Sequence, residues 1–302
     1  MGPFWHKASV CPYCGSTSPY RFSSTDRNQG AVPDSFRYFR CRACLLLFHD
    51  QIPADLRPFY TKEQYGIPAS DQVAFQPRAD SQRWKVDILK TLGSPGPLFE
   101  VGPATGEFAV AAQQAGFQPT LAEMDPSCCT FLRETLKLNV VQTADPAAVL
   151  ATARPFSFIC IWQAIEHIPR FWELLDRAAE NIVCGGVIVI STPNPCSLQA
   201  RILGRFWPHL DTPRHLHLIP QSWFHQFARK HNLSVTLDTT RDVGSLGLNY
   251  YGWYLAVRNA LRPRMTDERY HGWAKIITDF LRQWEEAEGQ GCCYTLALRK
   301  ES

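Results

Sequence analysis

Short apolar runs alternate with amphipathic segments along most of this chain. Apolar runs bounded by Gly, Pro or polar residues are typical of buried strands, and apolar residues spaced by three and four are typical of helices. Strands and helices of this length that alternate along a chain indicate a parallel α/β sheet with right-handed crossovers. The pattern predicts strands over residues 98–101, 139–142, 156–162, 187–191, 233–239 and 293–298, and helices over residues 81–92, 108–114, 130–137, 171–182 and 221–231.

A turn of small residues joins the first strand to the next helix, in the sequence LFEVGPATGEFAV at residues 98–110. Gly102, Ala104 and Gly106 let a ligand approach the backbone closely, and two of the three take positive φ at no steric cost. The helix that follows turns its N-terminus toward the ligand. The sequence therefore predicts a ligand site at this turn.

Two carboxylates indicate which ligand the turn binds. Glu100 lies two residues before Gly102, where it would repel a pyrophosphate and suits a cationic ligand with an amino group. Glu123 lies 21 residues after Gly102, close to the spacing of about 20 residues at which a carboxylate meets ribose hydroxyls. An adenosine with a cationic amino-acid tail fits both acids, and that molecule is S-adenosylmethionine.

Four sequence stretches together resemble one enzyme family. EVGPATGEF resembles the E/D-x-G-x-G-x-G signature of class I S-adenosylmethionine-dependent methyltransferases, with Pro103 and Ala104 as departures. LAEMDPSCC resembles the end of the second strand of that family, FSFICIWQAIEHIPRFWELL its fourth strand and exit, and GGVIVISTPN its fifth strand. The resemblance implies a Rossmann-like, seven-stranded, mostly parallel sheet whose last strand is antiparallel. It covers most of the chain and is weakest between residues 241 and 290.

The resemblance also implies a set of cofactor-binding residues. Glu123 becomes the ribose ligand, with Asp125 on the same strand as the alternative. Asp145 lies where the family places an acid near the adenine amino group, although a plain loop aspartate explains it equally well. The expected cofactor contacts are Glu100, Gly102, Ala104, Gly106, Glu123, Asp125, Asp145, Trp162 and Gln163.

The methyl acceptor is expected beside the segment that follows the fifth strand. Residues 201–220, which include LDTPRHLHLIP, resemble one bacterial branch in which a zinc-binding N-terminus precedes the methyltransferase core. Polar groups at the mouth of the sheet can position an acceptor and remove its proton. The candidate bases are His215, His167 and Asp211, in that order. A corner histidine that holds a loop is an alternative for His167.

Two C-x-x-C pairs near the N-terminus predict a zinc ribbon. CPYC and CRAC are separated by 26 residues, which is the spacing of a tetrahedral four-thiolate site. A closed shell of four sulfurs leaves no open position for chemistry, so the metal would be structural. The predicted ligands are Cys11, Cys14, Cys41 and Cys44.

The chain divides into a ribbon at residues 1–50, a connector at 51–80 and a methyltransferase domain at 81–302. In the connector, Tyr60 and Tyr65 either pack on the core or close over the cofactor. Residues 241–290 form a helical insertion that packs on the sheet edge, covers the pocket as a lid, or contacts a membrane through residues 243–264 to present a lipid-linked substrate.

Composition narrows the functional classes. The net charge of +3 and pI of about 8.3, without a basic stripe, argue against a nucleic-acid partner. No apolar run reaches the length of a membrane span and the first residues lack a signal-peptide core, so a cytoplasmic protein is expected. We expect methylation of a small-molecule, sugar or cell-envelope glycan or lipid acceptor. The alternatives are an RNA methyltransferase that binds substrate through the ribbon and a non-catalytic cofactor-binding module.

Overall fold

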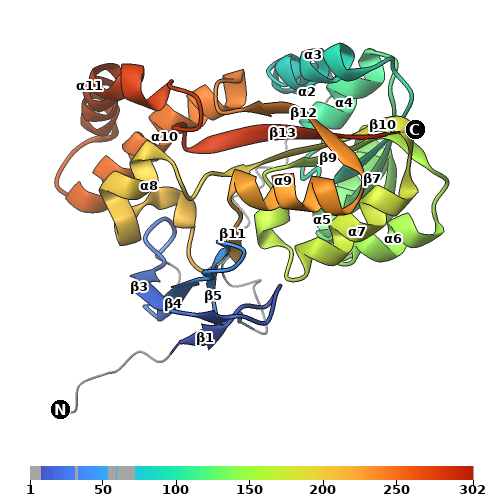
Figure 1. Cartoon of the computed structure of the whole chain (residues 1–302). Helices are drawn as coiled ribbons and strands as arrows, with labels where there is room; N and C mark the ends of the chain where they lie inside the picture. Colours follow the sequence, from blue (N-terminus) through green and yellow to red (C-terminus); the bar gives the residue numbers. More distant parts are fainter. Residues whose placement is uncertain (1–7, 31–32, 54–58, 60–71, 302) are drawn as a thin grey trace.

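A seven-stranded sheet forms the centre of the molecule in the computed structural model, which describes residues 8–30, 33–53, 59 and 72–301 (Figure 1). The predicted roles of Tyr60 and Tyr65 lie outside the described residues. In the order of the sheet, the strands are β12 (Leu233–Thr239), β13 (Cys293–Lys300), β10 (Ile182–Pro193), β9 (Phe156–Trp162), β6 (Pro97–Val101), β7 (Gln118–Glu123) and β8 (Asn139–Gln142).

The direction of the strands confirms the predicted fold class. Strands β10, β9, β6, β7 and β8 pair in parallel, whereas β13 runs antiparallel between β10 and β12. Strand β13 is the last one in the chain, as predicted. The carboxyl ends of the parallel strands therefore meet at one edge of the sheet, where ligands bind in open α/β folds.

Helices cover both faces of this sheet because the parallel strands are apolar on both sides. One face packs against α2 (Gln72–Asp80), α3 (Arg83–Leu92), α4 (Glu107–Gln114) and α5 (Pro126–Thr130). The opposite face packs against α6 (Pro146–Thr152), α7 (Phe171–Asn181) and α9 (Gln221–Lys230).

Some element boundaries differ from the predicted ones. Helix α5 begins at Pro126, four residues before the predicted start, because the Asp125 side chain caps it by accepting a hydrogen bond from Cys128 N. A π-helical turn over Phe131–Thr135 continues it. The predicted connector is helical from residue 72, where α2 begins.

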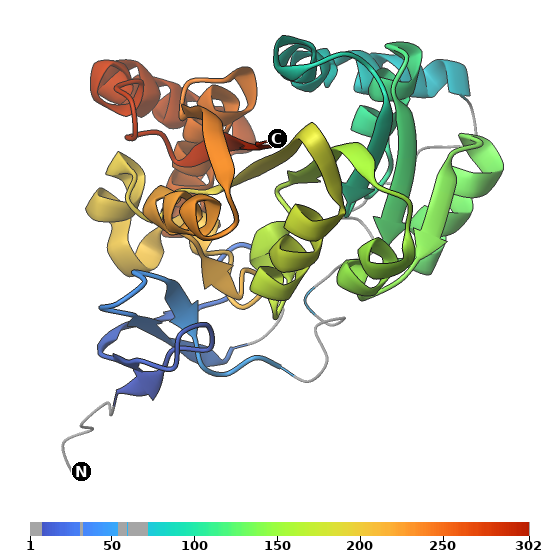
Figure 2. The ribbon, with the colours of Figure 1, turned by 45° about the vertical axis from the view of Figure 1, so that its right-hand side comes forward.

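A smaller sheet, which the sequence did not predict, joins the N-terminal segment to the region that carries the main sheet. It has the order β11 (His217–Leu218), β5 (Leu47–His49), β4 (Ser35–Arg40) and β3 (Tyr20–Thr25). Strand β11 belongs to the segment after β10 and pairs antiparallel with β5, so that His217 lies opposite Phe48. Figure 2 shows the blue N-terminal strands beneath the yellow and orange segment that carries β11.

The N-terminal segment also shares a hydrophobic core with the main sheet. Cys11, Phe39 and Phe48 belong to the same buried cluster as Phe171 of α7 and Trp223 of α9. The Tyr13 ring lies edge-on to Trp223, with 5.0 Å between the ring centroids. Burial of this shared apolar surface holds the N-terminal segment in a fixed position on the main sheet and its helices.

Residues 241–290 form a pair of helices, as predicted: α10 (Val243–Leu261) and α11 (Asp267–Glu285). Trp253 of α10 donates a hydrogen bond of 2.9 Å to the buried carboxylate of Glu285 and so ties the two helices together. Among the described helices, none is both long and apolar enough to cross a bilayer. The larger exposed apolar side chains of this region lie mainly on α11, outside the predicted contact at residues 243–264: Trp273, Ile276, Phe280 and Trp284.

Candidate functional site

The turn between β6 and α4 has three backbone positions in the left-handed region. Gly102 has φ +65°, Ala104 φ +50° and Gly106 φ +85°. Glycine takes this conformation without steric cost, whereas Ala104 is strained by its Cβ. Left-handed residues at every second position turn the chain sharply. The first turn of α4 therefore begins at the carboxyl edge of the sheet.

Both glycines also lie against other parts of the chain. A Cβ on Gly106 would lie 2.4 Å from Leu132 Cδ2, and one on Gly102 would lie 3.0 Å from Ala164 Cβ. Because real Cβ atoms hardly ever approach closer than about 3 Å, a larger residue at Gly106 would displace the turn or the helix behind it. The spacing of small residues therefore reflects close packing as well as backbone conformation.

Glu123, the last residue of β7, lies directly beside this turn. Its Oε2 accepts a hydrogen bond of 3.0 Å from Ala104 N, and its Oε1 accepts 2.8 Å bonds from the backbone N–H groups of Met124 and Asp125. Burial raises the pKa of the carboxyl group, although these backbone hydrogen bonds oppose the shift. The contact with Ala104 joins the two predicted halves of the cofactor site, from β6 and β7.

Glu100 is the buried acid on the other side of the turn. Its side chain is 3 % exposed, and its Oε2 has no hydrogen-bond partner among the described residues. Burial raises the pKa of Glu100 to about 8, against the opposing attraction of the Lys85 ammonium. At this pKa Glu100 is protonated at neutral pH without a further cationic partner, and a cofactor ammonium would supply the missing hydrogen-bond donor and favour the carboxylate. The residues at the turn therefore fit S-adenosylmethionine.

Lys85 of α3 is a charged neighbour of this site that the sequence did not indicate. Its Nζ lies 5.1 Å from the centroid of the Trp162 ring and 5.8 Å from that of Phe108. Burial lowers the pKa of Lys85, although Glu100 opposes this shift. The sequence offered no reason to select Lys85, because its helix has only the apolar spacing of an amphipathic helix and contains no motif. It provides a cation beside Glu100, which suits the carboxylate of an amino-acid tail.

The remaining predicted cofactor residues have clear structural surroundings. Trp162 is buried in the core with its ring edge-on to Trp84 and Phe108. Gln163 follows it with φ +50° and donates a 2.9 Å hydrogen bond from Nε2 to Ser191 Oγ. Asp125 and Asp145 each cap a helix, α5 and α6 respectively. Whether these four side chains also contact the cofactor remains a prediction.

A second buried polar group lies at the same edge, beyond β9 and β10. Glu166 is fully buried, and its Oε2 accepts a 2.9 Å hydrogen bond from Thr192 at the end of β10. His215 Nε2 lies 3.9 Å from Glu166 Oε1 and 3.6 Å from Asp211 Oδ2. The structure therefore brings together all three predicted bases, since the His167 ring also packs against that of His215, and it adds Glu166, which was not among them.

Backbone carbonyls orient both histidines of this group. His215 Nδ1 lies 2.8 Å from His209 O, and His167 Nδ1 lies 3.0 Å from Arg214 O. A carbonyl oxygen only accepts hydrogen bonds, so each Nδ1 carries a proton and each neutral ring keeps its lone pair on Nε2. The two rings lie edge-on with centroids 4.7 Å apart. His215 therefore presents an acceptor nitrogen toward the acids.

Burial sets the protonation states of the group at neutral pH. It raises the pKa of Glu166 to about 8 and lowers that of His215 to about 3 and that of His167 to about 4. Burial would also raise the pKa of Asp211, but His215 and Arg214 outweigh it and the pKa is lowered. Glu166 therefore keeps a proton, the histidines are neutral and Asp211 is ionised.

Glu166, His167 and His215 also satisfy a simple geometric test for a metal site, with one ligand atom each within 4.8 Å of the others. The Arg214 guanidinium forms an ion pair with Asp211 and lowers the pKa of both histidines. A cation at this position would meet the same repulsion. The arrangement fits a proton-handling group better than a metal centre.

His217 points elsewhere, with Nε2 2.9 Å from Pro169 O, and holds the chain at β11.

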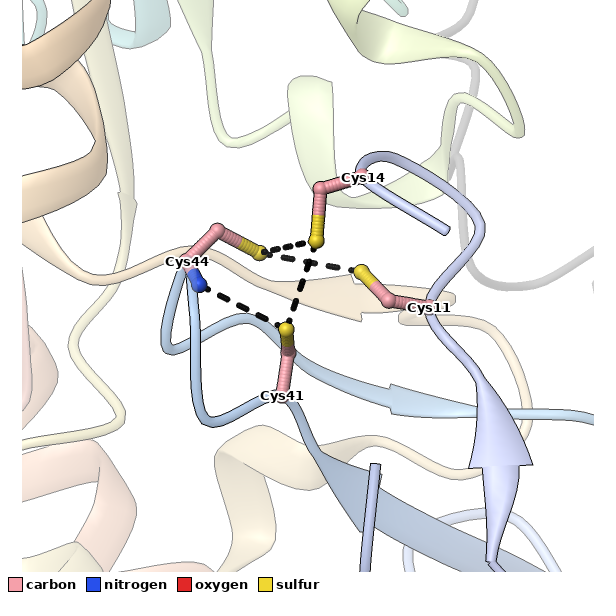
Figure 3. A group of neighbouring side chains, drawn as sticks. All are labelled: Cys11, Cys14, Cys41 and Cys44. Atoms are coloured by element: carbon pink, nitrogen blue, oxygen red, sulfur yellow. Dashed lines mark hydrogen bonds between the residues drawn. The ribbon is translucent and has the colours of Figure 1, made fainter. Parts of the chain in front are cut away.

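The four predicted zinc ligands converge in the N-terminal ribbon (Figure 3). The sulfur–sulfur distances are 3.6 Å for Cys11 and Cys44, 3.5 Å for Cys14 and Cys41, and 3.8 Å for Cys14 and Cys44. Four thiolates at ~2.3 Å from a zinc ion lie about 3.8 Å from one another in a tetrahedron. All four cysteines are free thiols, so the geometry and chemistry of the group fit a zinc ion.

A surface depression between α3 and α4 lies away from this chemistry. It is lined by residues near the C-terminal end of α4, among them Gln114 and Ala115, with Arg83 and Lys90 from α3. Helix α4 begins at the carboxyl edge, so its C-terminal end lies toward the opposite edge of the sheet. The depression is therefore not part of the candidate site.

Comparison with known proteins identifies the family of the chain. A family model described as a methyltransferase domain matches residues 77–237, more than half of the 302-residue chain. No curated protein sequence matches. A SAM-dependent methyltransferase from Archaeoglobus fulgidus has a similar structure, with a TM-score of 0.51 and 18% identity over 74% of this chain and 94% of the other. Another from Thermotoga maritima has a TM-score of 0.46 and 13% identity, over 73% and 89%. The chain belongs to the family of methyltransferase domains.

Proposed function

We propose that this protein transfers a methyl group from S-adenosylmethionine to a small-molecule, sugar or cell-envelope acceptor bound beside Glu166 and His215. The observation that carries the proposal is the turn at residues 102–106, which lies between the unpartnered carboxylate oxygen of Glu100 and the carboxylate of Glu123. These groups match an amino-acid ammonium on one side and ribose hydroxyls on the other. Family membership supports the same reaction class.

S-adenosylmethionine, when bound, supplies an activated methyl group that an acceptor can take by in-line displacement. The protein then has to orient the two reactants rather than activate the donor. Glu100 and Glu123 would fix the two ends of the cofactor, and Lys85 would face its carboxylate. Because β9 lies beside β6, the acceptor group beyond β9 and β10 is adjacent to the cofactor group.

His215 is the residue best placed to remove a proton from an acceptor hydroxyl or amine. Its Nε2 carries the free lone pair, and the ionised Asp211 lies 3.6 Å away, where it would stabilise the imidazolium that forms. Protonated Glu166, 3.9 Å from the same nitrogen, can donate a hydrogen bond to the acceptor without adding negative charge. We assign His167 a positioning role, because its ring packs against that of His215.

The zinc ion in this proposal is structural and is held by Cys11, Cys14, Cys41 and Cys44. A four-sulfur shell has no open coordination position, so it contributes folding energy rather than chemistry. The net charge of +3 favours a small or glycan acceptor over RNA, which remains the alternative. A lipid acceptor is consistent with the exposed apolar residues of α11.

Two measurements test the proposal. Calorimetry should show that S-adenosylhomocysteine binds the full chain, and this affinity should fall in Glu123→Ala. Labelled S-adenosylmethionine, incubated with separate pools of RNA, lipids and sugar nucleotides, should transfer label to a non-RNA pool. Absence of cofactor binding would refute the assignment, and label on RNA alone would establish the alternative. Binding without transfer to any pool would favour a non-catalytic module.

A further inference from the structure

Two arginines from distant parts of the chain face one exposed aromatic ring beside the acceptor segment. The guanidinium carbon of Arg27, in the ribbon, lies 4.3 Å from the centroid of the Phe206 ring, and that of Arg205 lies 4.8 Å from it. Phe206 is 44 % exposed, and both arginines are exposed. This set, the Arg27–Phe206–Arg205 clamp, is assembled only by the contact between the ribbon and residues 204–212.

The two positive charges of the clamp are not neutralised by an acid. Within the described residues, neither guanidinium forms an ion pair. Burial and the neighbouring Arg205 together lower the pKa of Arg27. A third arginine, Arg258 of α10, donates a 3.0 Å hydrogen bond to Asn28 O in the turn that follows Arg27, and its own Nε is buried without a partner. Like charges held together in this way are stabilised by an anion.

A small surface hollow lies beside the clamp, and Arg27 of the clamp and Asp211 of the acceptor group both line it. It is lined on the ribbon side by Ser24, Thr25, Arg27 and Asn28, and on the other side by Trp207, Pro208 and residues 210–212. Asp211 lies 3.6 Å from His215 Nε2. Asn28, on the ribbon side, donates hydrogen bonds from its Nδ2 to Pro208 O and Asp211 Oδ1. The clamp and the proposed base are therefore connected through the residues that line this hollow.

We propose that the Arg27–Phe206–Arg205 clamp binds a phosphate or diphosphate group of the methyl acceptor. Guanidinium groups match phosphate oxygens with paired N–H donors, and the Phe206 ring holds both guanidinium groups in place by cation–π contacts. The inference rests on the proposed function, because it assigns the acceptor and not the methyl donor. The phosphate can belong to a soluble ester or to a lipid headgroup, and the chemistry of the clamp is the same for both.

The test uses the full chain, three probes and a matched pair of variants. The probes are pyrophosphate, uridine diphosphate, and phosphatidylcholine vesicles that contain phosphatidic acid. Arg27→Gln with Arg205→Gln removes two charges from the clamp. Arg154→Gln with Arg229→Gln removes two exposed charges elsewhere, so it controls for net charge. Affinity for S-adenosylhomocysteine is measured in parallel for every variant.

At least one probe should bind the wild-type chain, and the clamp variant should lose about tenfold or more of this affinity, the loss expected for removal of charge-assisted hydrogen bonds. The control variant and the affinity for S-adenosylhomocysteine should change little. Preference for uridine diphosphate indicates a soluble ester, and preference for vesicles indicates a lipid-linked one. Equal losses in both variants, or no binding of any probe, would overturn the clamp. Loss of S-adenosylhomocysteine binding by the wild-type chain would instead refute the proposed function.

Discussion

The side-chain amide of Asn28, in the ribbon, donates a hydrogen bond of 2.7 Å to Oδ1 of Asp211, in the segment that carries His215. Two more ribbon residues hold the same segment: Tyr38 shares a 2.8 Å hydrogen bond with Thr212, and His49 Nε2 lies 3.1 Å from Pro213 O. Buried polar contacts of this kind fix the position of the chain on which they act. The ribbon therefore supports the proposed acceptor site from behind.

We predict that loss of the zinc site lowers turnover more than cofactor affinity. Cys41→Ser with Cys44→Ser should release the metal and loosen the ribbon, so that Asp211 and His215 lose their support. Elemental analysis should find one zinc per wild-type chain, and calorimetry should show S-adenosylhomocysteine binding largely preserved in the variant. Cys184→Ser, an exposed cysteine, is the control. Full metal-free activity in the variant would contradict the support role.

Gly106→Ala should weaken both the fold and cofactor binding. Its φ of +85° and the 2.4 Å approach to Leu132 combine a backbone strain of roughly 1–2 kcal/mol with overpacking of about 1–3 kcal/mol. Denaturant unfolding and calorimetry measure the two losses. Gly247→Ala, in α10 with no atom within 4 Å of its Cβ, should instead stabilise the chain by roughly 0.5–1 kcal/mol. Equal effects at the two positions would exclude the packing explanation.

Substitutions of Glu123 and of Asp125 should differ in their effects on cofactor affinity and on stability. Glu123→Ala removes a carboxylate at the end of β7, and we expect cofactor binding to weaken by about 1.5–3 kcal/mol for each lost hydrogen bond to a charged group. Asp125→Ala removes the cap of α5, which should cost about 1 kcal/mol of stability with little effect on affinity. Isothermal titration with S-adenosylhomocysteine distinguishes them. The reverse order of effects would move the ribose role to Asp125.

His215→Asn should lower kcat by roughly 10²–10⁴-fold once the acceptor is known, because general-base catalysis contributes about this much. Affinity for S-adenosylhomocysteine should stay near that of the wild type, since His215 lies on the acceptor side. His225→Asn, on the partly exposed face of α9, is the control and should retain activity. A parallel fall in kcat and in cofactor affinity would indicate a structural role for His215.

Four buried histidines and the partly buried His167 should lower the stability of the fold on acidification. Burial lowers the pKa of His215 to about 3, and those of His49, His167, His209 and His217 to about 4. Because these folded-state values lie below the unfolded value of about 6.5, the histidines favour the folded state above about pH 6.5. This contribution is lost as the pH falls toward 4. Glu100 and Glu166, whose folded-state pKa values are raised to about 8, act in the opposite direction over this range. Thermal unfolding between pH 8 and 4 is therefore compared with that of His217→Asn, which should lower the acid sensitivity, and an unchanged profile in this variant would contradict the contribution of that ring.

The sequence alone predicted the fold class, which the structure confirms, and it proposed the residues of the cofactor half of the site. The spacing of apolar residues that predicts strands and helices can be seen within a short stretch of sequence, and so can a turn of small residues. The site residues Glu100, Gly102, Gly106 and Glu123 could therefore be proposed without coordinates. The two C-x-x-C pairs were equally local signals. The start of α5 was predicted from the apolar pattern, which does not show where a helix is capped. The helix begins earlier, at Pro126, because the Asp125 side chain caps it.

Only the tertiary structure decided how the ribbon and the acceptor segment meet. Strand β11 has two residues, too few to show the alternation of apolar and polar positions that is typical of a strand. It forms because Leu218 pairs with Leu47, 171 positions earlier in the chain. Glu166 and Lys85 acquire their chemistry from burial, which no local pattern reports. The Arg27–Phe206–Arg205 clamp likewise joins residues that are far apart in sequence. Contacts between distant segments are set by packing of the whole core, so the acceptor side could be seen only after the chain had folded.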